Sequence, residues 1–374
     1  MSPRKLWAIA VKELRQASRD PLSLGMLLGL PTVMLLFYGY ALNFDVRHVS
    51  LAVEDDDKTA ASRELVASFV NSTYFDLARV LTPGTDVGEL TERRLARAVL
   101  VIPEGYARDL AANRTARVQL VLDGTDSNTA MTVLGYASSL VAEANVEIVR
   151  SAAGGEGAGP PVDYRPRAWY NPELRSTQFL VPGLIGYILM QSCVLATALS
   201  VVREKERGTM EQLLVSSLRP VELIVGKTLP YLAIMVLATV MILVASRVLF
   251  DIRVRGSYLD LSAVVLIYLV GALSFGLVIS SFSDTQAVAF QAGIVMSTFP
   301  SIFLSGFIFP IRSMPPALQA VTYAIPARYF LVVVRGVILK GADLGPYVQD
   351  MAFLALYAAA MLGIAFTRLR KREF

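Results

Sequence analysis

Six long apolar stretches constrain this chain more than any other feature of its sequence. A membrane helix needs roughly 20 mainly apolar residues, because every backbone donor and acceptor must be satisfied within the helix where water is absent. Hydrophobic residues make up 54% of the chain, more than in most soluble domains. The six stretches are residues 22–42, 178–202, 228–250, 259–282, 287–309 and 347–367. We therefore predict an α-helical polytopic membrane protein with six transmembrane helices.

The segment before the first apolar stretch is charged and amphipathic. Residues 1–21 hold apolar and charged side chains at helical spacing, and no small-residue cleavage site follows residues 22–42. We therefore expect an uncleaved anchor, preceded by a cytoplasmic elbow helix that lies on the membrane surface. Its apolar face would be Trp7, Ile9, Ala10 and Leu14, and its polar face Lys5, Lys12, Glu13 and Arg15.

Basic residues gather beside particular spans and predict the orientation. Cytoplasmic loops of membrane proteins carry an excess of lysine and arginine. Basic residues are dense in 1–21, 203–227 and the tail 368–374, while the opposing loops carry Arg253, Arg255, Arg312, Arg328, Arg335 and Lys340. We expect the three dense segments in the cytoplasm, which puts a multi-pass protein in the cytoplasmic (inner) membrane with both termini inside.

The polar stretch between the first two spans reads as a separate domain. Within residues 43–177, β-like runs alternate with segments of helical period. The expected strands are 49–53, 98–102 and 118–122, and the expected helices are 59–71, 104–113 and 128–150. We predict an inserted extracytoplasmic α/β domain, with a flexible Gly/Pro-rich return at residues 153–161.

Composition excludes several kinds of site. The net charge is +4, and the basic residues lie beside apolar stretches, so we expect no nucleic-acid surface. Cys193 and His48 are single residues of their types, which rules out an intramolecular disulfide and a multi-histidine metal site. The run EDDD at 54–57 is favoured as a solvated turn over a cation site, and DGTDSN at 123–128 as a turn before a helix. We expect no metal and no cofactor.

No segment of the sequence resembles a nucleotide-binding loop. Gly226, Lys227 and Thr228 match the last three positions of such a motif. The motif also requires a glycine five residues before Gly226, and that position is Val221. We expect no catalytic residue in this chain, and any ATP to be bound by another polypeptide. The centres of the six stretches also lack ionisable residues, which ion-coupled carriers usually keep.

Residues 203–227 combine charge with a narrow apolar stripe. Glu204, Glu206, Arg207 and Glu211 lie above Met210, Leu213, Leu214 and Leu218 at helical spacing. A short helix of this kind could dock into a soluble partner or lie on lipid. Periodicity favours neither alternative.

Three stretches of sequence resemble one known family. They read KELRQASRDP at 12–21, REKERGTMEQLL with LRPVELIVGKTLPY between 203 and 231, and SGFIFPIRSMPPALQAVTYAIPARYFLVVVRGVILKG at 305–341. With the order of elements, they resemble type-2 ABC transporter permeases over nearly the whole chain. The most similar branch has a large extracytoplasmic domain between spans one and two and includes multidrug-efflux permeases.

The resemblance implies an assembly and two sets of site residues. It implies a dimer of two permeases and separate cytoplasmic ABC ATPase subunits that grip the segment after span two. The implied ATPase-coupling helix comprises Glu204, Glu206, Arg207, Gly208, Thr209, Met210, Glu211, Leu213 and Leu214. The implied outer gate comprises Gly306, Pro310, Met314, Pro315, Pro326 and Arg328. Ser217 departs from the family pattern, which has a proline there.

Prolines around the fifth stretch suggest how such a gate would be built. Pro300, Pro310, Pro315 and Pro316 are expected to break regular helix, and broken backbone at membrane depth is tolerated when it is buried in protein or lines a cavity. We expect a re-entrant segment near 305–330, although a structural kink fits equally well.

The leading hypothesis is the permease subunit of an ATP-driven exporter of amphiphilic compounds such as drugs or lipids. An ion-coupled secondary transporter and a non-transporting receptor that displays the α/β domain are the alternatives. The expected dimer is a homodimer or a heterodimer of permeases, with or without a periplasmic adaptor.

Overall fold

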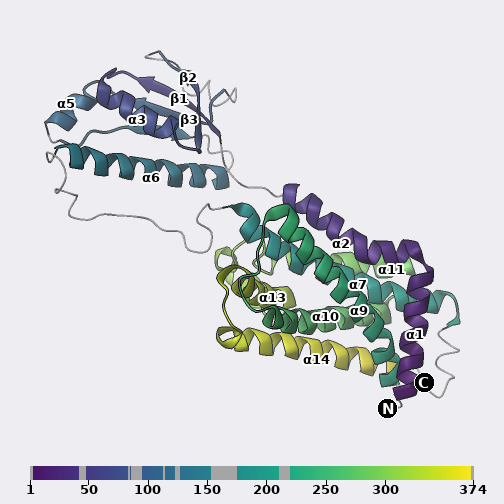
Figure 1. Ribbon diagram of the computed structural model, residues 1–374. Coiled ribbons are helices and arrows are strands. Elements are labelled where there is room, and N and C mark those ends of the chain that lie inside the picture. The colour runs from purple at the N-terminus through teal and green to yellow at the C-terminus, as the bar shows by residue number, and fades with distance from the viewer. Residues whose placement is uncertain are drawn as a thin grey trace. The chain divides into compact units, whose positions relative to one another are not determined.

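The computed structural model of this protein describes residues 3–41, 48–82, 85, 95–112, 114–122, 127–152, 175–209 and 220–371. The chain divides into two compact units (Figure 1). The helical unit contains residues 1–43 and 169–374, and the inserted unit contains residues 44–168.

The helical unit is built from long helices that follow the predicted apolar stretches. The helices are α1 (Pro3–Arg19), α2 (Pro21–Ala41), α7 (Ser176–Glu206), α9 (Pro220–Phe250), α10 (Tyr258–Phe282), α11 (Gln286–Phe303) and α14 (Val348–Lys371). Among the described residues, six helices are long and apolar enough to cross a membrane, namely all of these except α1. The predicted fold class, a polytopic helical membrane protein with an inserted domain, is confirmed.

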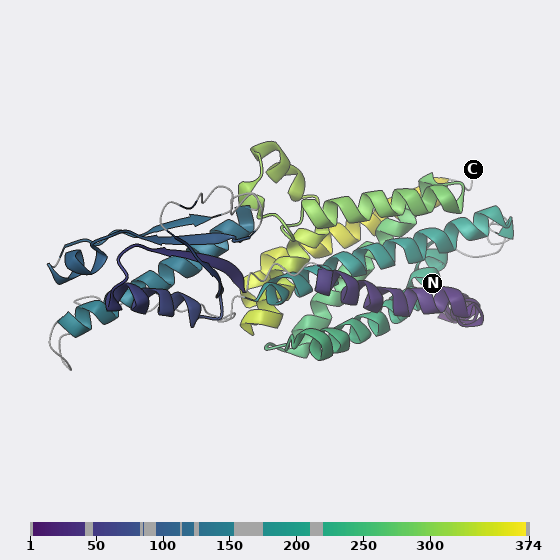
Figure 2. The same cartoon turned by 90° about the horizontal axis from the view of Figure 1, so that it is seen from above.

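Helices α7 and α10 form the centre of the helical unit, and Figure 2 shows α7, in teal, between α2 and α11. In their most apolar parts 78% and 61% of residues are buried, against 17% in α2 and in α14. Gly276 of α10 lies directly against α7, where an added Cβ would be 2.5 Å from the carbonyl oxygen of Val194. The hydroxyl of Thr197 also donates to the carbonyl of Leu273 at 2.8 Å. This close packing makes α7 and α10 one rigid pair.

The segment after α11 turns sharply. It contains the short 3-10 helix η1 (Ile311–Ser313), α12 (Pro316–Thr322), α13 (Pro326–Arg335) and the π-helical turn η2 (Gly336–Lys340). The helices on either side of the break at residues 323–325 are bent by 79°, as in a broken span or a re-entrant loop. Before α14, the 3-10 turn η3 (Gly345–Tyr347) completes the connection. Tyr268 of α10 stacks on Phe330 of α13 with ring centroids 3.9 Å apart, which anchors the segment to the centre.

One expected helix break is absent. Pro300 lies inside α11 and does not end it. The helix ends three residues later at Phe303, and the amide of Leu304 still donates to the carbonyl of Pro300 at 3.0 Å. A proline removes one hydrogen bond from the helix and its ring crowds the carbonyl four residues earlier, but membrane helices tolerate it when neighbouring groups satisfy the freed backbone.

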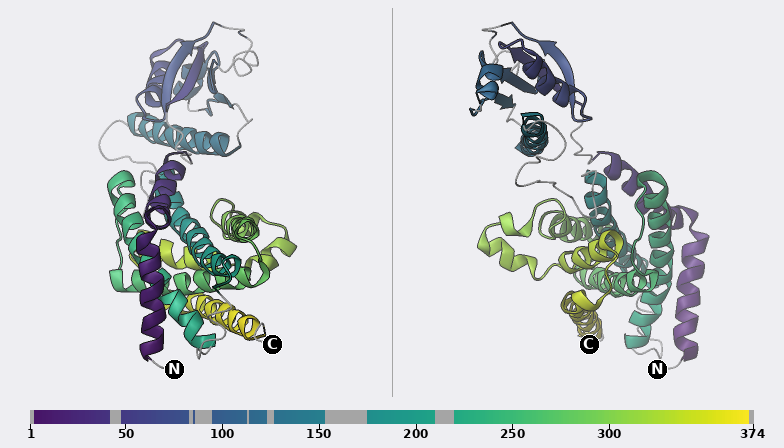
Figure 3. Two further views of the ribbon diagram at one scale, coloured as in Figure 1. Left: turned by 90° about the vertical axis from the view of Figure 1, so that its right-hand side faces the viewer. Right: turned by 60° about the vertical axis from the view of Figure 1, so that its left-hand side comes forward.

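Both ends of the chain lie at one end of the helical unit. Figures 1 and 3 show the start of α1 and the end of α14 at the same end of the helical unit. The side chain of Arg368 near the end of α14 lies over the ring of Phe282, 4.7 Å from its centroid, at the last residue of α10. An even number of crossings produces this arrangement.

The inserted unit is a four-stranded sheet with helices on one face. Its strands are β1 (Val49–Asp55), β2 (Phe75–Val80), β3 (Ala98–Ile102) and β4 (Gln119–Leu122), in the order β2-β1-β3-β4. β1 is parallel to β2 and β3, and β4 is antiparallel to β3. The helices are α3 (Ala60–Val70), α5 (Tyr106–Ala111) and α6 (Ser127–Ala152). Leu51 and Leu100 of the sheet share a core with Phe69 of α3 and Val133 of α6.

Strand β2 was missed by the sequence prediction. Its sequence, FDLARV, alternates only over Phe75, Asp76 and Leu77 before Ala78 interrupts the pattern, and a run this short is a weak strand signal. Only Phe75 of its six residues is buried. The β1 to β2 register instead holds it in place, with Val49 opposite Phe75 and Leu51 opposite Leu77.

The acidic run at 54–57 has a local structural role. The carboxylate of Asp57 accepts from the amides of Gly105 and Ala107 at 2.9 and 3.0 Å and from the hydroxyl of Thr59 at 2.6 Å. These bonds hold the start of α5 and lower the pKa of Asp57 from its ordinary value, the Thr59 bond being the largest cause. The run therefore joins two chain segments of the inserted unit.

Candidate functional site

The last turn of α7 lies near the middle of α1 and near the ends of α2, α9, α10 and α11. We call this region the charged junction. It comprises Lys12, Glu13, Asp20, Arg203, Glu204, Lys205, Glu206, Lys227 and Gln286, with the backbone of Ser280 and Ser283. Below it, Val201, Ile224, Leu277 and Ala365 form a small apolar cluster from α7, α9, α10 and α14. The region therefore links the end of α7 to most of the bundle.

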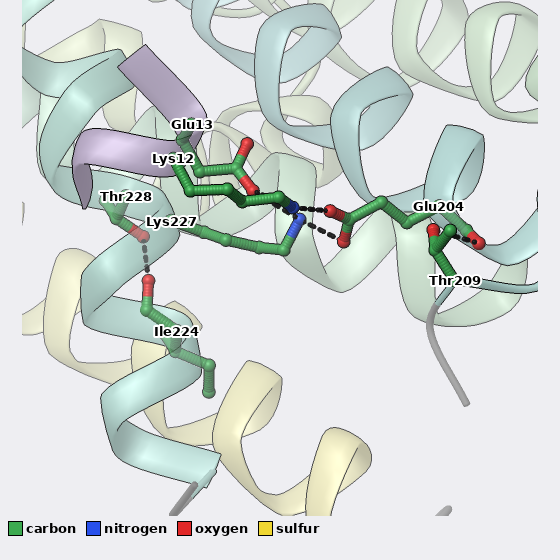
Figure 4. A network of polar contacts seen from close by, with 7 residues as sticks. All are labelled: Lys12, Glu13, Glu204, Thr209, Ile224, Lys227 and Thr228. Carbon is green, nitrogen blue, oxygen red and sulfur yellow. Dashed lines mark hydrogen bonds and ion pairs between the residues drawn. The ribbon is translucent and has the colours of Figure 1, made fainter. Parts of the chain in front are cut away.

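Four charged side chains form the centre of the charged junction (Figure 4). Glu13, Glu204 and Lys227 are only 2%, 4% and 3% exposed. The Nζ of Lys227 lies 2.5 Å from a carboxylate oxygen of Glu204 and 3.3 Å from one of Glu13. Lys12 lies 3.0 Å from Glu13 and also donates to Glu204. Two positive and two negative charges thus compensate each other, as buried charges require.

Lys12 is the most exposed member of this group, with a side chain that is 44% exposed. Burial on its own lowers the pKa of an amine, because it disfavours the charged form. The hydrogen bonds and negative charges of Glu204 and Glu13 outweigh burial and raise the pKa of Lys12 from its ordinary value of 10.5. Lys12 is therefore charged at neutral pH.

The remaining charges at the end of α7 contact other helices. Arg203 lies 3.4 Å from the carboxylate of Asp20, between α1 and α2. The Nζ of Lys205 donates to the carbonyls of Ser280 and Ser283 at 2.6 and 2.9 Å, at the end of α10. A lysine at a helix C-terminus satisfies carbonyls that have no partner within the helix.

Glu206 holds the first residue of α11. Its carboxylate accepts from the backbone amide of Gln286 at 2.7 Å and from the side-chain amide of the same residue. A carboxylate at a helix N-terminus is favoured by the free amides and by the helix dipole. Glu206 therefore joins α7 to α11, although its side chain remains exposed.

The end of α7 departs from the expected continuous charged helix. The helix stops at Glu206, and Gly208 has a φ of +69°, a left-handed conformation that glycine adopts without steric cost. Glu204 and Glu206 thus lie on α7 itself, and Glu204 is buried in the charged junction instead of facing a soluble partner. Arg207, Gly208 and Thr209 are exposed. The predicted coupling residues Met210, Glu211, Leu213 and Leu214 lie outside the described residues.

Helix α1 contacts other helices with side chains from both of its expected faces, namely Glu13 from the polar face and Ile9 from the apolar face. Lys12 and Glu13 point into the charged junction, while Trp7 and Leu14 are 73% and 50% exposed. Ile9 packs on Gly226 of α9 so closely that an added Cβ would lie 2.8 Å from it. Sequence reasoning missed this function of Lys12, Glu13 and Lys227. The sequence signal that could have revealed it was the position of Glu13 and Lys227 at the edges of otherwise apolar helical faces.

The predicted gate residues are distributed along the bent segment after α11. Gly306 has a φ of +81°, Pro310 precedes η1, Met314 follows it, and Pro315 precedes α12. Pro326 is the first residue of α13. The guanidinium of Arg328 lies 3.9 Å from the ring centroid of Tyr323 and donates to the hydroxyl of Thr322. These residues shape the turns at both ends of α12.

Arg335 joins this segment to α7 and was expected only as a loop residue. Its guanidinium donates to the carbonyls of Gly306, Phe307 and Phe179 at 3.2 to 3.4 Å. It also lies 3.8 Å from the ring centroid of Phe179 at the start of α7. Arg335 therefore fixes the turn after α11 against the opposite end of α7 from the charged junction.

The described part of the chain offers ion pairs and helix junctions, and no group of three or more His, Cys, Asp or Glu side chains there could hold a metal ion. The contacts at the charged junction can hold the end of α7 against its neighbouring helices, so that a movement of one helix is passed to the others. It provides no nucleophile activated by a base.

Comparison with known proteins agrees with this architecture. The model of the family described as ABC-2 family transporter protein matches residues 22–367. The chain is 33% identical to the "Probable multidrug ABC transporter permease YbhS" of Escherichia coli (strain K12), over all of this chain and 98% of that protein. It is 30% identical to the protein named YbhR, over 98% of this chain and 99% of that protein. It is 25% identical to the "Inner membrane transport permease YhhJ" of the same organism, over 98% of this chain and 97% of that protein. Six membrane-capable helices, the inserted domain and a family match over nearly the whole length show that the chain is a type-2 ABC permease and belongs to the ABC-2 transporter family.

Proposed function

We propose that this chain is the membrane-spanning subunit of an ATP-driven exporter that is powered by a separate cytoplasmic ABC ATPase. The proposed substrates are amphiphilic compounds such as drugs or lipids, which are moved out of the cytoplasm or the inner leaflet. Two permeases would form the membrane part, as a homodimer or a heterodimer. A periplasmic adaptor would be compatible with the inserted domain.

The observation that carries the proposal is the position of the charged junction. It binds the last turn of α7 and the start of α9, which flank residues 210–219, through the 2.5 Å ion pair of Glu204 and Lys227. Glu206 and Lys205 extend the same connection to α11 and α10. A displacement applied to residues 210–219 would therefore move several helices together.

This arrangement supports a mechanical mechanism. ATP binding would draw two ATPases together and displace the segment after α7, and the helices attached to the charged junction would shift between two packings. A driver changes such an equilibrium only through its different affinity for the two states. The bent segment from Gly306 to Arg328 would then open or close at the far end of the bundle. No side chain of this chain needs to react with the substrate.

Two observations support the orientation with both termini in the cytoplasm. The start of α1 and the end of α14 lie at the same end of the helical unit (Figure 3), and Arg368 of α14 contacts Phe282, next to the Ser283 carbonyl that Lys205 of the charged junction binds. The sequence is also densely basic near both chain ends and after α7. The ATPase would bind there. The inserted domain follows α2 in sequence and would lie on the outer side.

The proposal can be tested in proteoliposomes that contain the full chain together with an ABC ATPase that co-purifies with it. Uptake of a fluorescent amphiphilic dye should require ATP and the ATPase, and should persist when an uncoupler removes the proton gradient. The variant Glu206→Lys places a cation beside the amides at the start of α11, so ATP-driven uptake should fall about tenfold or more, as expected when a charge-assisted contact becomes repulsive. Co-purification of the ATPase should also fall.

The exposed Glu143 on α6 provides the matched control. Glu143→Lys makes the same charge change in the inserted domain and should leave uptake and co-purification unchanged. Undiminished uptake in Glu206→Lys would remove the charged junction from the coupling route. Dye uptake by the chain alone, driven by a proton gradient, would overturn the proposal in favour of an ion-coupled carrier.

A further inference from the structure

A groove between α9 and α10 lies at the opposite end of α9 from Lys227. Its volume is about 600 Å³, within the range of roughly 300 to 1,000 Å³ that is typical of ligand sites. The walls are mainly apolar and include Val240, Val244, Leu261 and Leu266. Val240, Val244 and Leu266 are 51%, 57% and 42% exposed, so the groove is open on one side. Both helices are candidate membrane spans, and the open side therefore lies at membrane depth.

The length of the groove matches one leaflet. Its lining runs along α9 from Val236 to Val248, which is about 18 Å of helix at 1.5 Å per residue. One leaflet contributes about 15 Å to the hydrocarbon core. A single acyl chain could therefore lie along the groove from the membrane surface to the middle of the bilayer.

The end of the groove at the α9 to α10 loop is positively charged. Arg247 and Arg253 line it, and the lining contains no carboxylate among the described residues. Asp251, outside the lining, pairs with Arg247 and lies 3.6 Å from Arg253. One carboxylate between two guanidinium groups leaves a net charge of +1. The side chains of Arg247 and Arg253 are 47% and 68% exposed, so both can reach a ligand at the membrane surface.

The backbone of the α9 to α10 loop holds Arg253 in place, whereas Arg247 lies in the last turn of α9. Asp251 has a φ of +52°, a left-handed conformation that aspartate tolerates better than most residues. The amide of Ile252 donates back to the carbonyl of Ser246 at 3.2 Å, and the amides of Arg255 and Gly256 donate to the carbonyls of Ile338 and Val337. The loop is therefore bonded both to α9 and to η2, and these bonds hold Arg253 near Arg247 at the end of α9.

We propose that the α9–α10 groove binds one anionic phospholipid of the surrounding membrane. The acyl chain would lie against the apolar walls, and the phosphate would lie between Arg247 and Arg253. The planar guanidinium group forms paired hydrogen bonds with phosphate oxygens, which favours phosphate recognition by arginine. The apolar groove has the length of one leaflet and fits the acyl chain of a phospholipid, and the arginines at its surface end fit the phosphate headgroup.

The test measures lipid occupancy in the full chain. The two native tryptophans are replaced (Trp7→Phe, Trp169→Phe) and a reporter is placed in the groove (Leu266→Trp). The protein is reconstituted in phosphatidylcholine vesicles that contain increasing fractions of phosphatidylglycerol, with bromine on the acyl chains of one lipid at a time. Quenching of the reporter should saturate at a lower mole fraction of brominated phosphatidylglycerol than of brominated phosphatidylcholine.

Variants separate phosphate recognition from general charge. Arg247→Gln and Arg253→Gln should each lower the preference for phosphatidylglycerol about fivefold, the factor associated with one cation near anionic lipid. Arg255 is exposed in the same loop but does not line the groove, so Arg255→Gln should leave the preference unchanged. Val244→Phe, which fills the slot without a charge change, should reduce quenching by both lipids.

Three results would overturn the proposal. Equal quenching by the two lipids would remove the headgroup recognition. An Arg255→Gln effect as large as that of Arg253→Gln would assign the preference to the net charge of the loop. A loss of quenching at high protein density, with lipid composition constant, would show that a second copy of the chain covers the groove. Arg253 is largely exposed, so its variants are expected to fold, and the midpoint of thermal unfolding checks this.

Discussion

Lys227 of α9 and Glu204 of α7 form an ion pair of 2.5 Å in which both side chains are almost completely buried. Such a pair restrains the relative position of two helices more than it stabilises the fold, because desolvation offsets much of the attraction between the charges. Removing one partner is costly, since it leaves a buried charge without compensation. This asymmetry makes the pair a sensitive test of the charged junction.

A double-mutant cycle on this pair should show strong coupling. Glu204→Gln and Lys227→Met should each destabilise the chain by about 3 kcal/mol, and the double variant should lose clearly less than the sum. The measurement is the midpoint of thermal unfolding. Unfolding is detected by the reaction of a fluorescent thiol reagent with Cys193, which is buried in the native protein. The exposed pair Arg247 and Asp251 provides the control, for which removal should cost less than about 1 kcal/mol. Additive losses at Glu204 and Lys227 would contradict the coupling.

The raised pKa of Lys12 predicts a loss of stability at alkaline pH. A cation whose pKa is higher in the folded state stabilises that state fully below its unfolded pKa, and this contribution disappears as pH rises through the folded pKa. The folded pKa lies above 10.5. The melting temperature of the wild type, measured by circular dichroism from about pH 9 to about pH 11.5, should therefore fall more steeply than that of Lys12→Met. Because tyrosines ionise in both proteins, only the difference between the curves is informative, and parallel curves would contradict the prediction.

The lowered pKa of Asp57 predicts that the inserted unit loses stability at acidic pH. A carboxylate whose pKa is depressed on folding stabilises the folded state above its unfolded pKa, and this contribution is lost as pH falls through the folded pKa, which lies below 3.8. In the full chain, protection of the Gly105 and Ala107 amides from hydrogen exchange should decrease in this acidic range. Asp57→Ala should show the decrease already at neutral pH. Asp76→Asn, which alters an exposed acid of β2, is the control and should leave those amides protected.

The spans were predictable from sequence because lipid imposes its requirement on each helix separately. An apolar run such as 259–282 has to be a helix whatever its neighbours are, and α10 occupies Tyr258–Phe282. The charged junction was not predictable in this way, because Lys12 and Glu204 are 192 residues apart and their pairing depends on the packed bundle. The same limit applies to Arg335, whose partners are backbone carbonyls that leave no signature in the sequence.

The central packing of α7 and α10 yields a prediction that separates steric exclusion from helix propensity. Glycine to alanine normally favours a helix by about 1 kcal/mol. At Gly276 an added Cβ would be 2.5 Å from the carbonyl oxygen of Val194 and closer still to the hydroxyl of Thr197. The Val194 oxygen belongs to the α7 backbone, so relief requires the two helices to separate.

Gly276→Ala should therefore lower the thermal midpoint despite its better helix propensity, by the equivalent of roughly 2 kcal/mol or more, as for other overpacked cores. Gly363 of α14 has no atom within 4 Å of the added Cβ, so Gly363→Ala should leave the midpoint unchanged or raise it. Adding Thr197→Ala to Gly276→Ala should restore only part of the loss, because it removes the hydroxyl contact and leaves the carbonyl contact. Full restoration would mean that the hydroxyl alone sets the distance between the helices, and that the α7 backbone is not the limiting surface.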